Sequence, residues 1–286
     1  MNKLNKIYVS TTFAENNSKI SNVLLSCKKE NISKIELGSN HVYEQDFEKI
    51  VKKYKFDYIV HNYFPVPKKS FVVNIASLDK KIRDQSLKHV KNAILFCKKT
   101  NAKLYTFHPG FIGDPEKASN SNKNYDFIWK KNEVKKCYDT AFKNMINSLK
   151  EIVRFAKKNK VKIAIETEGS FRKKNLCLMQ RPEEYKKLFY YFLPNDLGIS
   201  LNIGHLNLAS KAFNFSRKKF VDGIKNYIVA LELSHNNRLD DQHLPLKKNA
   251  WYWEIINDPF FAETYKILEF RNTNIKKFKQ NIKYFV

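Results

Sequence analysis

The stretch NEVKKCYDTAFKNMINSLKEIVRFAKKNKVKIAIET, residues 132–167, contains the alternation that decides the fold. Apolar residues recur every three to four positions over 132–159, which predicts an amphipathic helix. The β-branched run that follows, 161–167, predicts a strand. A second long helix is predicted over 78–100. The same alternation predicts eight strands: 6–12, 32–38, 56–62, 102–108, 161–167, 197–203, 227–233 and 265–271.

Eight strands that alternate with helices, without a composition break or a linker, predict a single (β/α)8 TIM barrel domain over residues 1–286. A doubly wound open sheet is the alternative fold. Long irregular stretches follow predicted strands or their carboxyl ends at 62–77, 109–129 and 244–261. In a barrel, loops at the carboxyl ends of the strands carry the functional residues, so we expect the site there.

The composition excludes several classes of protein. A hydrophobic content of 43% with 14% aromatic residues excludes a disordered chain, and no apolar run approaches the roughly 20 residues of a membrane span. The start, MNKLNKIYVSTTF, lacks the apolar stretch of a secretory signal. The four cysteines form no C-x-x-C pair, which argues against a zinc knuckle or a disulfide framework. We therefore expect a cytoplasmic protein.

The chain is strongly basic, with 53 Lys+Arg against 28 Asp+Glu and a formal charge of +25. Such a charge raises the question of a nucleic-acid partner. However, the excess is mostly Lys, and it is spread over every predicted helix. A general compositional bias explains it as well as a binding face does, so nucleic acid is the less favoured partner.

Side chains alternate between the two faces of a strand, so one inward residue fixes its neighbours at steps of two. The pattern is coherent on five strands if the polar residue at each carboxyl end points into the barrel. The residues then expected inside are Thr106, Ala164, Ser200, Ile228, Ala230 and Ile267. Those expected to face the helices are Phe107, Ile163, Ile165, Leu201, Val229, Leu231, Leu233 and Leu268.

This arrangement would gather imidazole and carboxylate groups at one rim: His61, His108, Glu166, Asn202, His205, Glu232 and Glu269, with Asp241 and His243 from SHNNRLDDQHLPL (234–246). Nitrogen donors and anionic oxygens in a concave site are typical ligands of divalent metal ions.

One histidine at a strand end is usually a hydrogen-bonded structural residue, but four of the seven histidines lie at strand ends here. Together with the glutamates, they favour a metal site. His41, His89 and His235 are expected to be structural, and Glu36 at the end of 32–38 is only weak support for a site.

The residues at the ends of the predicted strands lie in short motifs that resemble those of the xylose-isomerase-like TIM barrels. This superfamily includes sugar-phosphate isomerases and epimerases and the endonuclease IV type of apurinic endonuclease. The resemblance covers nearly the whole chain and rests on VHNYFP...NIAS (60–77), FHPG (107–110), IAIETEG (163–169), GISLNIGH (198–205), LELSHNNRLDDQHLPL (231–246) and ILEFR (267–271). Each motif alone is weak evidence. Six motifs in the order of the family are stronger evidence for the superfamily than for any one of its activities.

The resemblance implies a divalent metal cofactor, Mn2+, Mg2+ or Zn2+, as one to three ions. By analogy with three-metal members, the ligand sets would be His61, His108 and Glu166; then Glu166, Asn202, Glu232 and Glu269; then His205, Asp241 and His243. Isomerase and epimerase members usually keep only the middle set, where the residues matching Glu166 and Glu269 serve as ligands and as acid and base.

The middle set departs from the family pattern at two positions. The family aspartate is Asn202 here, and the family histidine is Glu232, so one carboxylate is lost and another is gained. Three carboxylates and an amide oxygen would suit Mg2+ or Mn2+ better than Zn2+. The alternative is that the middle site is empty or remodelled.

The favoured function is a metal-dependent isomerase or epimerase of a small sugar or sugar phosphate, with Glu166 and Glu269 as the catalytic pair. A metal on adjacent hydroxyl and carbonyl oxygens would ease proton removal from the carbon. Arg271 is expected to bind a substrate phosphate or carboxylate, and Trp251 and Trp253 to stack on a sugar ring. Several such barrels pair through their loops, which leaves a homodimer open.

The alternative function is an endonuclease IV-like phosphodiesterase acting on abasic DNA or another phosphate ester. The nearly complete histidine set and the positive charge favour it. The long, proline-containing loop after His61 and the DDQHLPL motif (240–246) favour the sugar enzymes instead.

Overall fold

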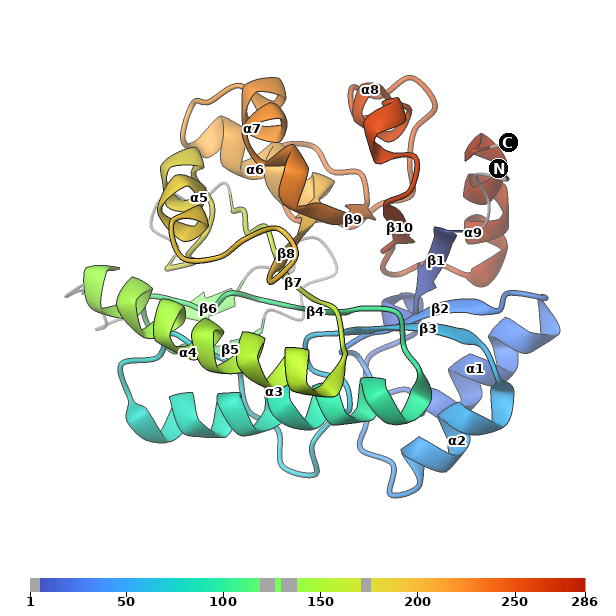
Figure 1. Ribbon diagram of the computed structural model, residues 1–286. Coiled ribbons are helices and arrows are strands. Elements are labelled where there is room, and N and C mark those ends of the chain that lie inside the picture. Colours follow the sequence, from blue (N-terminus) through green and yellow to red (C-terminus); the bar gives the residue numbers. More distant parts are fainter. Residues whose placement is uncertain (1–5, 119–126, 130–137, 171–175, 286) are drawn as a thin grey trace.

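The computed structural model describes residues 6–118, 127–129, 138–170 and 176–285. Eight parallel strands close into a barrel in the order β1, β10, β9, β8, β7, β4, β3, β2 (Figure 1). Their bounds are Ile7–Ser10 (β1), Lys34–Leu37 (β2), Asp57–His61 (β3), Tyr105–Phe107 (β4), Ile163–Glu166 (β7), Gly198–Asn202 (β8), Ile228–Leu233 (β9) and Tyr265–Leu268 (β10). Each strand lies within a predicted range, so the predicted barrel is confirmed.

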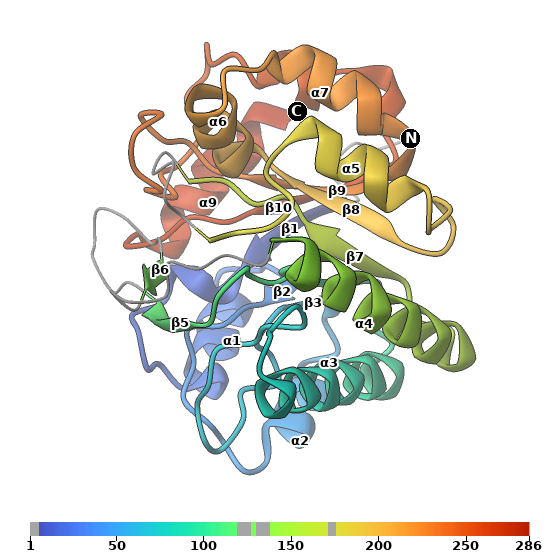
Figure 2. The same ribbon diagram turned by 90° about the vertical axis from the view of Figure 1, so that its left-hand side faces the viewer.

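Helices cover the outside of the barrel (Figures 1 and 2). They are α1 Ile20–Lys29, α2 Phe47–Tyr54, α3 Lys80–Thr100, α4 Tyr138–Asn159, α5 Pro182–Phe189, α6 Ile203–Ala212, α7 Arg217–Ile224, α8 Trp253–Ile256 and α9 Ile275–Ile282, with the short 3-10 turns η2 Thr11–Phe13, η3 Lys225–Tyr227, η4 Pro259–Phe261 and η5 Lys283–Phe285. The prediction of helices over 78–100 and 132–159 is confirmed for 80–100 and 138–159, and residues 132–137 lie outside the described residues.

Among the residues that the structure describes, no helix is both long enough and apolar enough to cross a membrane.

Two hydrophobic layers follow from strand alternation. The inner cluster fills the barrel and consists of Tyr8, Ile59, Leu104, Ala164, Ala230 and Ile267. The outer cluster packs the strands against the helices and includes Phe107, Ile163, Ile165, Leu201, Leu231, Leu233 and Leu268. The predicted alternation is therefore confirmed at these positions.

The predicted alternation is wrong at the start of β9. Ile228 belongs to the outer cluster, and Val229 packs against the inner one. The reason is a register shift: Ile199 pairs with Ile228, but Ser200 pairs with Ala230, so one extra residue is inserted in β9. An inserted residue reverses the faces of the residues before it.

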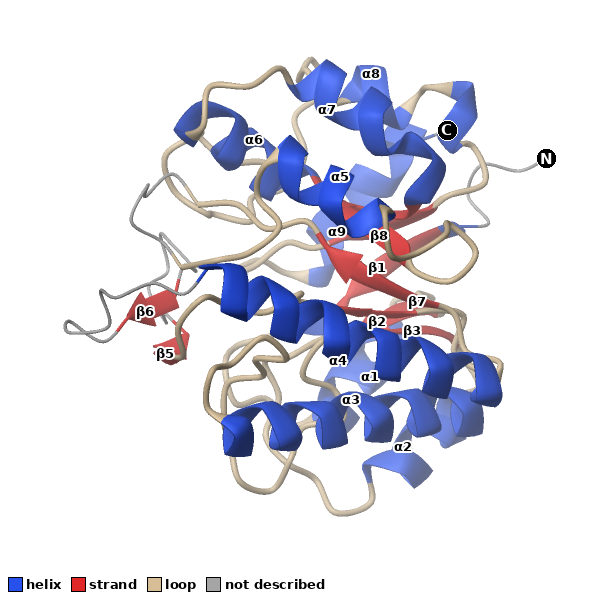
Figure 3. Ribbon diagram, turned by 60° about the vertical axis from the view of Figure 1, so that its left-hand side comes forward, coloured by secondary structure: helices blue, strands red, loops and turns tan. Residues whose placement is uncertain are grey.

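A small hairpin that the sequence did not predict lies outside the barrel, in the stretch 109–129. Strands β5 (Pro115–Ala118) and β6 (Phe127–Trp129) pair antiparallel (Figure 3). The chain just before the hairpin is tied to the loop after β3, because Asp114 accepts hydrogen bonds from Asn74 Nδ2 and Ser77 Oγ, both of 2.8 Å. The loops after β3 and β4 thus form one connected wall.

Candidate active site

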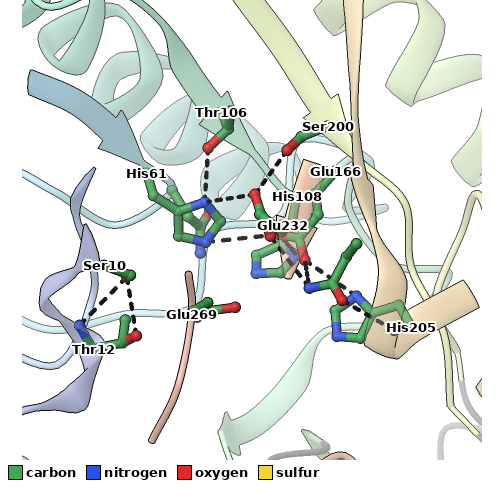
Figure 4. Close-up of polar contacts among 12 residues, drawn as sticks. Ser10, Thr12, His61, Thr106, His108, Glu166, Ser200, His205, Glu232 and Glu269 are labelled. Carbon is green, nitrogen blue, oxygen red and sulfur yellow. Dashed lines mark hydrogen bonds and ion pairs between the residues drawn. The ribbon is translucent and has the colours of Figure 1, made fainter. Parts of the chain in front are cut away.

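The predicted polar residues meet at the carboxyl end of the barrel. His61, Glu166 and Asn202 are the last residues of β3, β7 and β8, and Glu232 lies near the end of β9. His108 and Glu269 follow β4 and β10, His205 lies in the first turn of α6, and Asp241 and His243 lie in the loop after β9. All are buried except His108, which is partly exposed. Figure 4 shows the side chains of His61, Glu166 and Glu232 pointing toward one another.

A cavity of about 460 Å³ opens above these residues. Its lining includes the predicted His61, His108, Glu166, His205, Asp241, His243, Glu269 and Arg271. Asn202 and Glu232 are not part of the lining and are fully buried behind it. The loop after β3 contributes Tyr63 and Phe71, the loop after β4 contributes Phe111, and strand β6 contributes Phe127. The cavity therefore combines an acidic and imidazole-rich part with aromatic walls.

The first histidine cluster consists of His61, His108 and Glu166, whose ligand atoms lie within 4.8 Å of one another. Glu166 Oε2 is 3.7 Å from His61 Nε2 and 3.5 Å from His108 Nδ1. This oxygen is buried and has no hydrogen-bond partner among the described residues. Thr106 Oγ1 lies 2.9 Å from His61 Nδ1, and Glu168 Oε1 lies 2.5 Å from His108 Nδ1. The Thr106 contact orients the His61 ring so that Nε2 faces Glu166. Glu168 contacts the same His108 nitrogen that faces Glu166, so this cluster fits a divalent cation that displaces Glu168 from that nitrogen.

The charges in the first cluster are set by burial and by the neighbouring groups. Burial lowers the pKa of the His61 imidazole to about 4, so its ring is neutral, the form that binds metals. Burial also opposes the charged form of His108, but Glu168 and Glu166 outweigh it and raise the pKa of that imidazole to about 9. The nearby imidazoles hold the pKa of Glu166 well below its usual range, against the effect of burial.

The second histidine cluster consists of His205, Asp241 and His243, again with ligand atoms within 4.8 Å of one another. Asp241 Oδ2 is 3.0 Å from His243 Nε2 and 3.5 Å from His205 Nε2. The other ring nitrogens are oriented by the protein. His205 Nδ1 is 2.8 Å from the carbonyl oxygen of Thr167, and His243 Nδ1 is 3.1 Å from Glu269 Oε2. Two Nε2 atoms that face one carboxylate oxygen also fit a divalent cation.

Carboxylates dominate the electrostatics of the second cluster. Burial opposes the charged imidazoles, but Asp241 and Glu269 outweigh it and raise the pKa of His243 to about 9. Asp241 likewise holds the pKa of His205 well above its usual range. Burial opposes the charged form of Glu269, yet His243 and Arg271 lower the pKa of that carboxyl to about 2.

The residues of the middle set contact one another differently. Asn202 Nδ2 donates to Glu166 Oε1 at 2.8 Å and to Glu232 Oε2 at 3.2 Å. Ser200 Oγ donates to Glu232 Oε1 at 2.8 Å. Because an amide nitrogen that donates two hydrogen bonds cannot coordinate a cation, the middle set does not fit a metal ion in the way that the two histidine clusters do.

The tryptophans predicted to bind substrate lie elsewhere in the structure. The guanidinium carbon of Arg217 is 3.9 Å from the centroid of the Trp251 ring, and Trp253 Nε1 donates to the carbonyl oxygen of Lys247 at 2.7 Å. Neither tryptophan lines the described cavity, and the stretch 244–261 contributes no residue to it. The aromatic wall comes instead from the loops after β3 and β4.

Two carboxylates that lie close to the site histidines are not among the site residues predicted from the sequence. Glu168 lines the cavity and contacts His108, and Glu36 contributes a ligand atom within 4.8 Å of those of His61 and Glu232. Glu168 could have been predicted from its spacing, because it lies two residues after Glu166 and residues two apart share a face of a strand. Glu36 could not have been predicted with the same ease, because a single carboxylate at a strand end does not show whether its side chain points into the barrel.

Comparisons with known proteins agree with this geometry. The family described as "Xylose isomerase-like TIM barrel" matches residues 27–285. Among solved structures, the chain is similar to a D-tagatose 3-epimerase-like protein, with a TM-score of 0.70 and 21% identity, over 97% of this chain and 94% of that one. At that identity, the likeness shows the fold alone.

Two curated relatives match part of the chain. An uncharacterized protein of Methanocaldococcus jannaschii is 27% identical over 194 residues, which are 68% of this chain and 56% of that protein. Apurinic-apyrimidinic endonuclease 1 of Plasmodium falciparum is 41% identical over 66 residues, which are 23% of this chain and 10% of that protein. The matched regions thus span about half of the first relative and a tenth of the second.

Proposed function

The chain belongs to the xylose isomerase-like TIM barrel family, and on this premise we propose that it is a metal-dependent isomerase or epimerase of a small sugar or sugar phosphate. Glu166 and Glu269 would transfer the proton. The observation that carries the proposal is that both carboxylates line one cavity of about 460 Å³. That volume is within the usual range for small-molecule sites, about 300–1,000 Å³.

The two glutamates enter the cavity from separate strands, with β8 and β9 between β7 and β10. A substrate bound between them can therefore be approached by two carboxylates, as the exchange of a proton on either face of a carbon requires. Glu269 is oriented by His243 at 3.1 Å and by Arg271, whose Nη2 lies 3.5 Å from Glu269 Oε1. Arg271 also lines the cavity, which suits a substrate with a phosphate or carboxylate.

The histidine clusters would hold divalent cations, Mn2+, Mg2+ or Zn2+, through His61, His108 and Glu166 and through His205, Asp241 and His243. In this respect the chain would depart from the isomerase and epimerase members, which usually keep only the middle set. A bound cation would polarise the substrate oxygens and make the neighbouring carbon more acidic. The chain itself binds the sugar, excludes water with Phe71, Phe111 and Phe127, and moves the proton. A D-tagatose 3-epimerase-like protein, which shares this fold, indicates the class of substrate to test first.

Proton exchange with solvent tests this proposal even when the product of the reaction is not identified. Mn2+-loaded enzyme is incubated in D2O with a panel of aldoses, ketoses and their phosphates, and deuterium next to the carbonyl carbon is followed by NMR. We expect exchange on at least one sugar, reduced about 100-fold or more in Glu269→Gln, the scale of acid–base catalysis. The matched control is Glu151→Gln on the outer surface of α4, which should exchange like the wild type.

Absence of exchange on the whole panel, or exchange that does not depend on Glu269, would contradict the sugar assignment. A phosphodiesterase acting on abasic DNA is the second candidate. Two complete histidine clusters and the local similarity to an apurinic-apyrimidinic endonuclease favour it. Its test is metal-dependent cleavage of a duplex with one abasic site, abolished in both His61→Ala and His243→Ala.

A further inference from the structure

The side chain of Asn202 lies between three buried polar groups of the barrel, the backbone nitrogen of His205 and the carboxyl groups of Glu166 and Glu232. Asn202 is the last residue of β8 and the N-cap of α6, and its side-chain Oδ1 accepts a hydrogen bond from the backbone nitrogen of His205 at 3.0 Å. Its Nδ2 faces the other way and donates to Glu166 and Glu232. The side chain is 1% exposed, so water does not compete for these bonds.

The cap fixes the orientation of the amide. If the amide were turned over, Nδ2 would face the donor nitrogen of His205, and Oδ1 would face carboxylate oxygens. Both contacts would be repulsive, and the first turn of α6 would lose its acceptor. The one oxygen of the Asn202 side chain thus points toward the cap and away from Glu166 and Glu232. An aspartate has two oxygens and can cap the helix with one while the other binds a cation, but an asparagine cannot do both.

The other members of the middle set are also held by the protein. Glu232 accepts from Ser200 Oγ through one oxygen and from Asn202 Nδ2 through the other. Glu269 Oε2 lies 3.1 Å from His243, and its Oε1 lies 3.5 Å from Arg271. Glu166 Oε1 accepts from Asn202, while Oε2, which has no hydrogen-bond partner among the described residues, faces the first histidine cluster.

We infer that the amide of Asn202 replaces a cation between Glu166 and Glu232, so that divalent cations bind this chain only in the two histidine clusters. The two N–H donors of this amide, one to each carboxyl group, hold Glu166 and Glu232 together. One consequence is that Glu269 remains outside the cation sites and can act in proton transfer. The inference concerns cation binding alone and does not depend on the identity of the substrate.

The test is the number of ions bound to the full chain. Wild-type protein is stripped with a chelator, loaded with Mn2+, desalted and analysed for metal content. We expect two ions per chain in the wild type. Glu232→Gln should also bind two. The group Glu36, His61 and Glu232 shares His61 with the first cluster, and both oxygens of Glu232 already accept hydrogen bonds from Ser200 and Asn202, so this group should hold no ion of its own. His61→Ala and His243→Ala should each bind one.

Two variants of Asn202 test the argument about its single oxygen. In Asn202→Asp the second oxygen is available, so a third ion should bind. Thermal melting should show lower stability than the wild type without Mn2+, because three carboxylates then adjoin, and a larger stabilisation when Mn2+ is added. In Asn202→Ser the hydroxyl can still cap α6, but both N–H donors to Glu166 and Glu232 are lost, so added Mn2+ should stabilise this variant more than it stabilises the wild type.

Any wild-type ratio other than two would overturn the inference, as would the loss of an ion in Glu232→Gln. A folded Asn202→Asp that still binds two ions would overturn the argument about the single oxygen. Metal content is measured without substrate, so a failure of the sugar assignment in the deuterium-exchange assay would leave these results unchanged. The two failures are therefore distinguishable.

Discussion

The contact between Gly169 and α6 provides a sharp test of how the site is held together. Gly169 lies in the loop after β7 and lines the cavity, and its backbone packs on the start of α6. A Cβ added here would lie 2.0 Å from the carbonyl oxygen of His205, 2.6 Å from its carbonyl carbon and 2.8 Å from its Cα. All three atoms belong to helix backbone, which cannot rotate away as a flexible side chain can.

Gly169→Ala should therefore push α6 and the loop after β7 apart. Overpacking of a rigid site costs about 1–3 kcal/mol. The entropy of unfolding for a chain of this length is about 0.6 kcal/mol per kelvin, so the melting temperature should fall by about 2–5 °C. Because His205 belongs to the second histidine cluster, the same displacement should weaken cation binding there. Thermal melting with and without Mn2+ measures both effects.

Gly223→Ala is the matched control. Gly223 lies in α7, and apart from its chain neighbours and the backbone of its own helix no described heavy atom comes within 4 Å of a Cβ added there. Alanine is favoured over glycine in a helix by about 1 kcal/mol, so this variant should melt slightly above the wild type and bind Mn2+ normally. A Gly169→Ala protein that melts at or above the wild-type temperature would refute the packing argument.

Three further results are expected. Burial lowers the pKa values of His41 and His89 to about 4, so below about pH 6.5 the unfolded chain binds protons that the folded chain does not. Each of the two histidines should therefore lower the free energy of unfolding by about 2 kcal/mol as the pH falls from 7 to 5. In denaturant titrations, the free energy of unfolding of His41→Gln should depend less on pH than that of the wild type. The carboxylate of Glu184 accepts from the backbone nitrogens of three residues, 179, 180 and 181, so Glu184→Ala should lose at least about 2 kcal/mol in the same assay; an unchanged midpoint would count against this. Removal of metal with a chelator should lower the melting temperature reversibly, since a ligand at 100 times its Kd stabilises by about 2.7 kcal/mol.

The barrel could be predicted from the sequence because its strands carry a local signal. Each strand is a short apolar run between amphipathic helices, and this alternation permits few folds. The faces of β9 could not be predicted fully, since the extra residue at Val229 is a property of the pairing with β8. The hairpin of β5 and β6 depends on contacts made outside the barrel, and its two short strands, PEKA and FIW, show no regular alternation of apolar and polar residues.

The residues of the two histidine clusters could be anticipated because the carboxyl ends of parallel strands must meet at one rim. The orientation of Asn202 could not be anticipated, since it depends on where α6 begins. The sequence did not indicate that the indole of Trp251 would pack against Arg217 or that the indole of Trp253 would donate to Lys247. Aromatic residues in a loop bind substrate only if the loop faces the cavity.

Anomalous diffraction from a crystal soaked with Mn2+ tests the central claim most directly, because it locates each cation. The account predicts one peak within bonding distance of His61, His108 and Glu166 and a second within bonding distance of His205, Asp241 and His243. A peak between Glu166, Glu232 and Glu269, with the side chain of Asn202 turned toward it, would contradict the account.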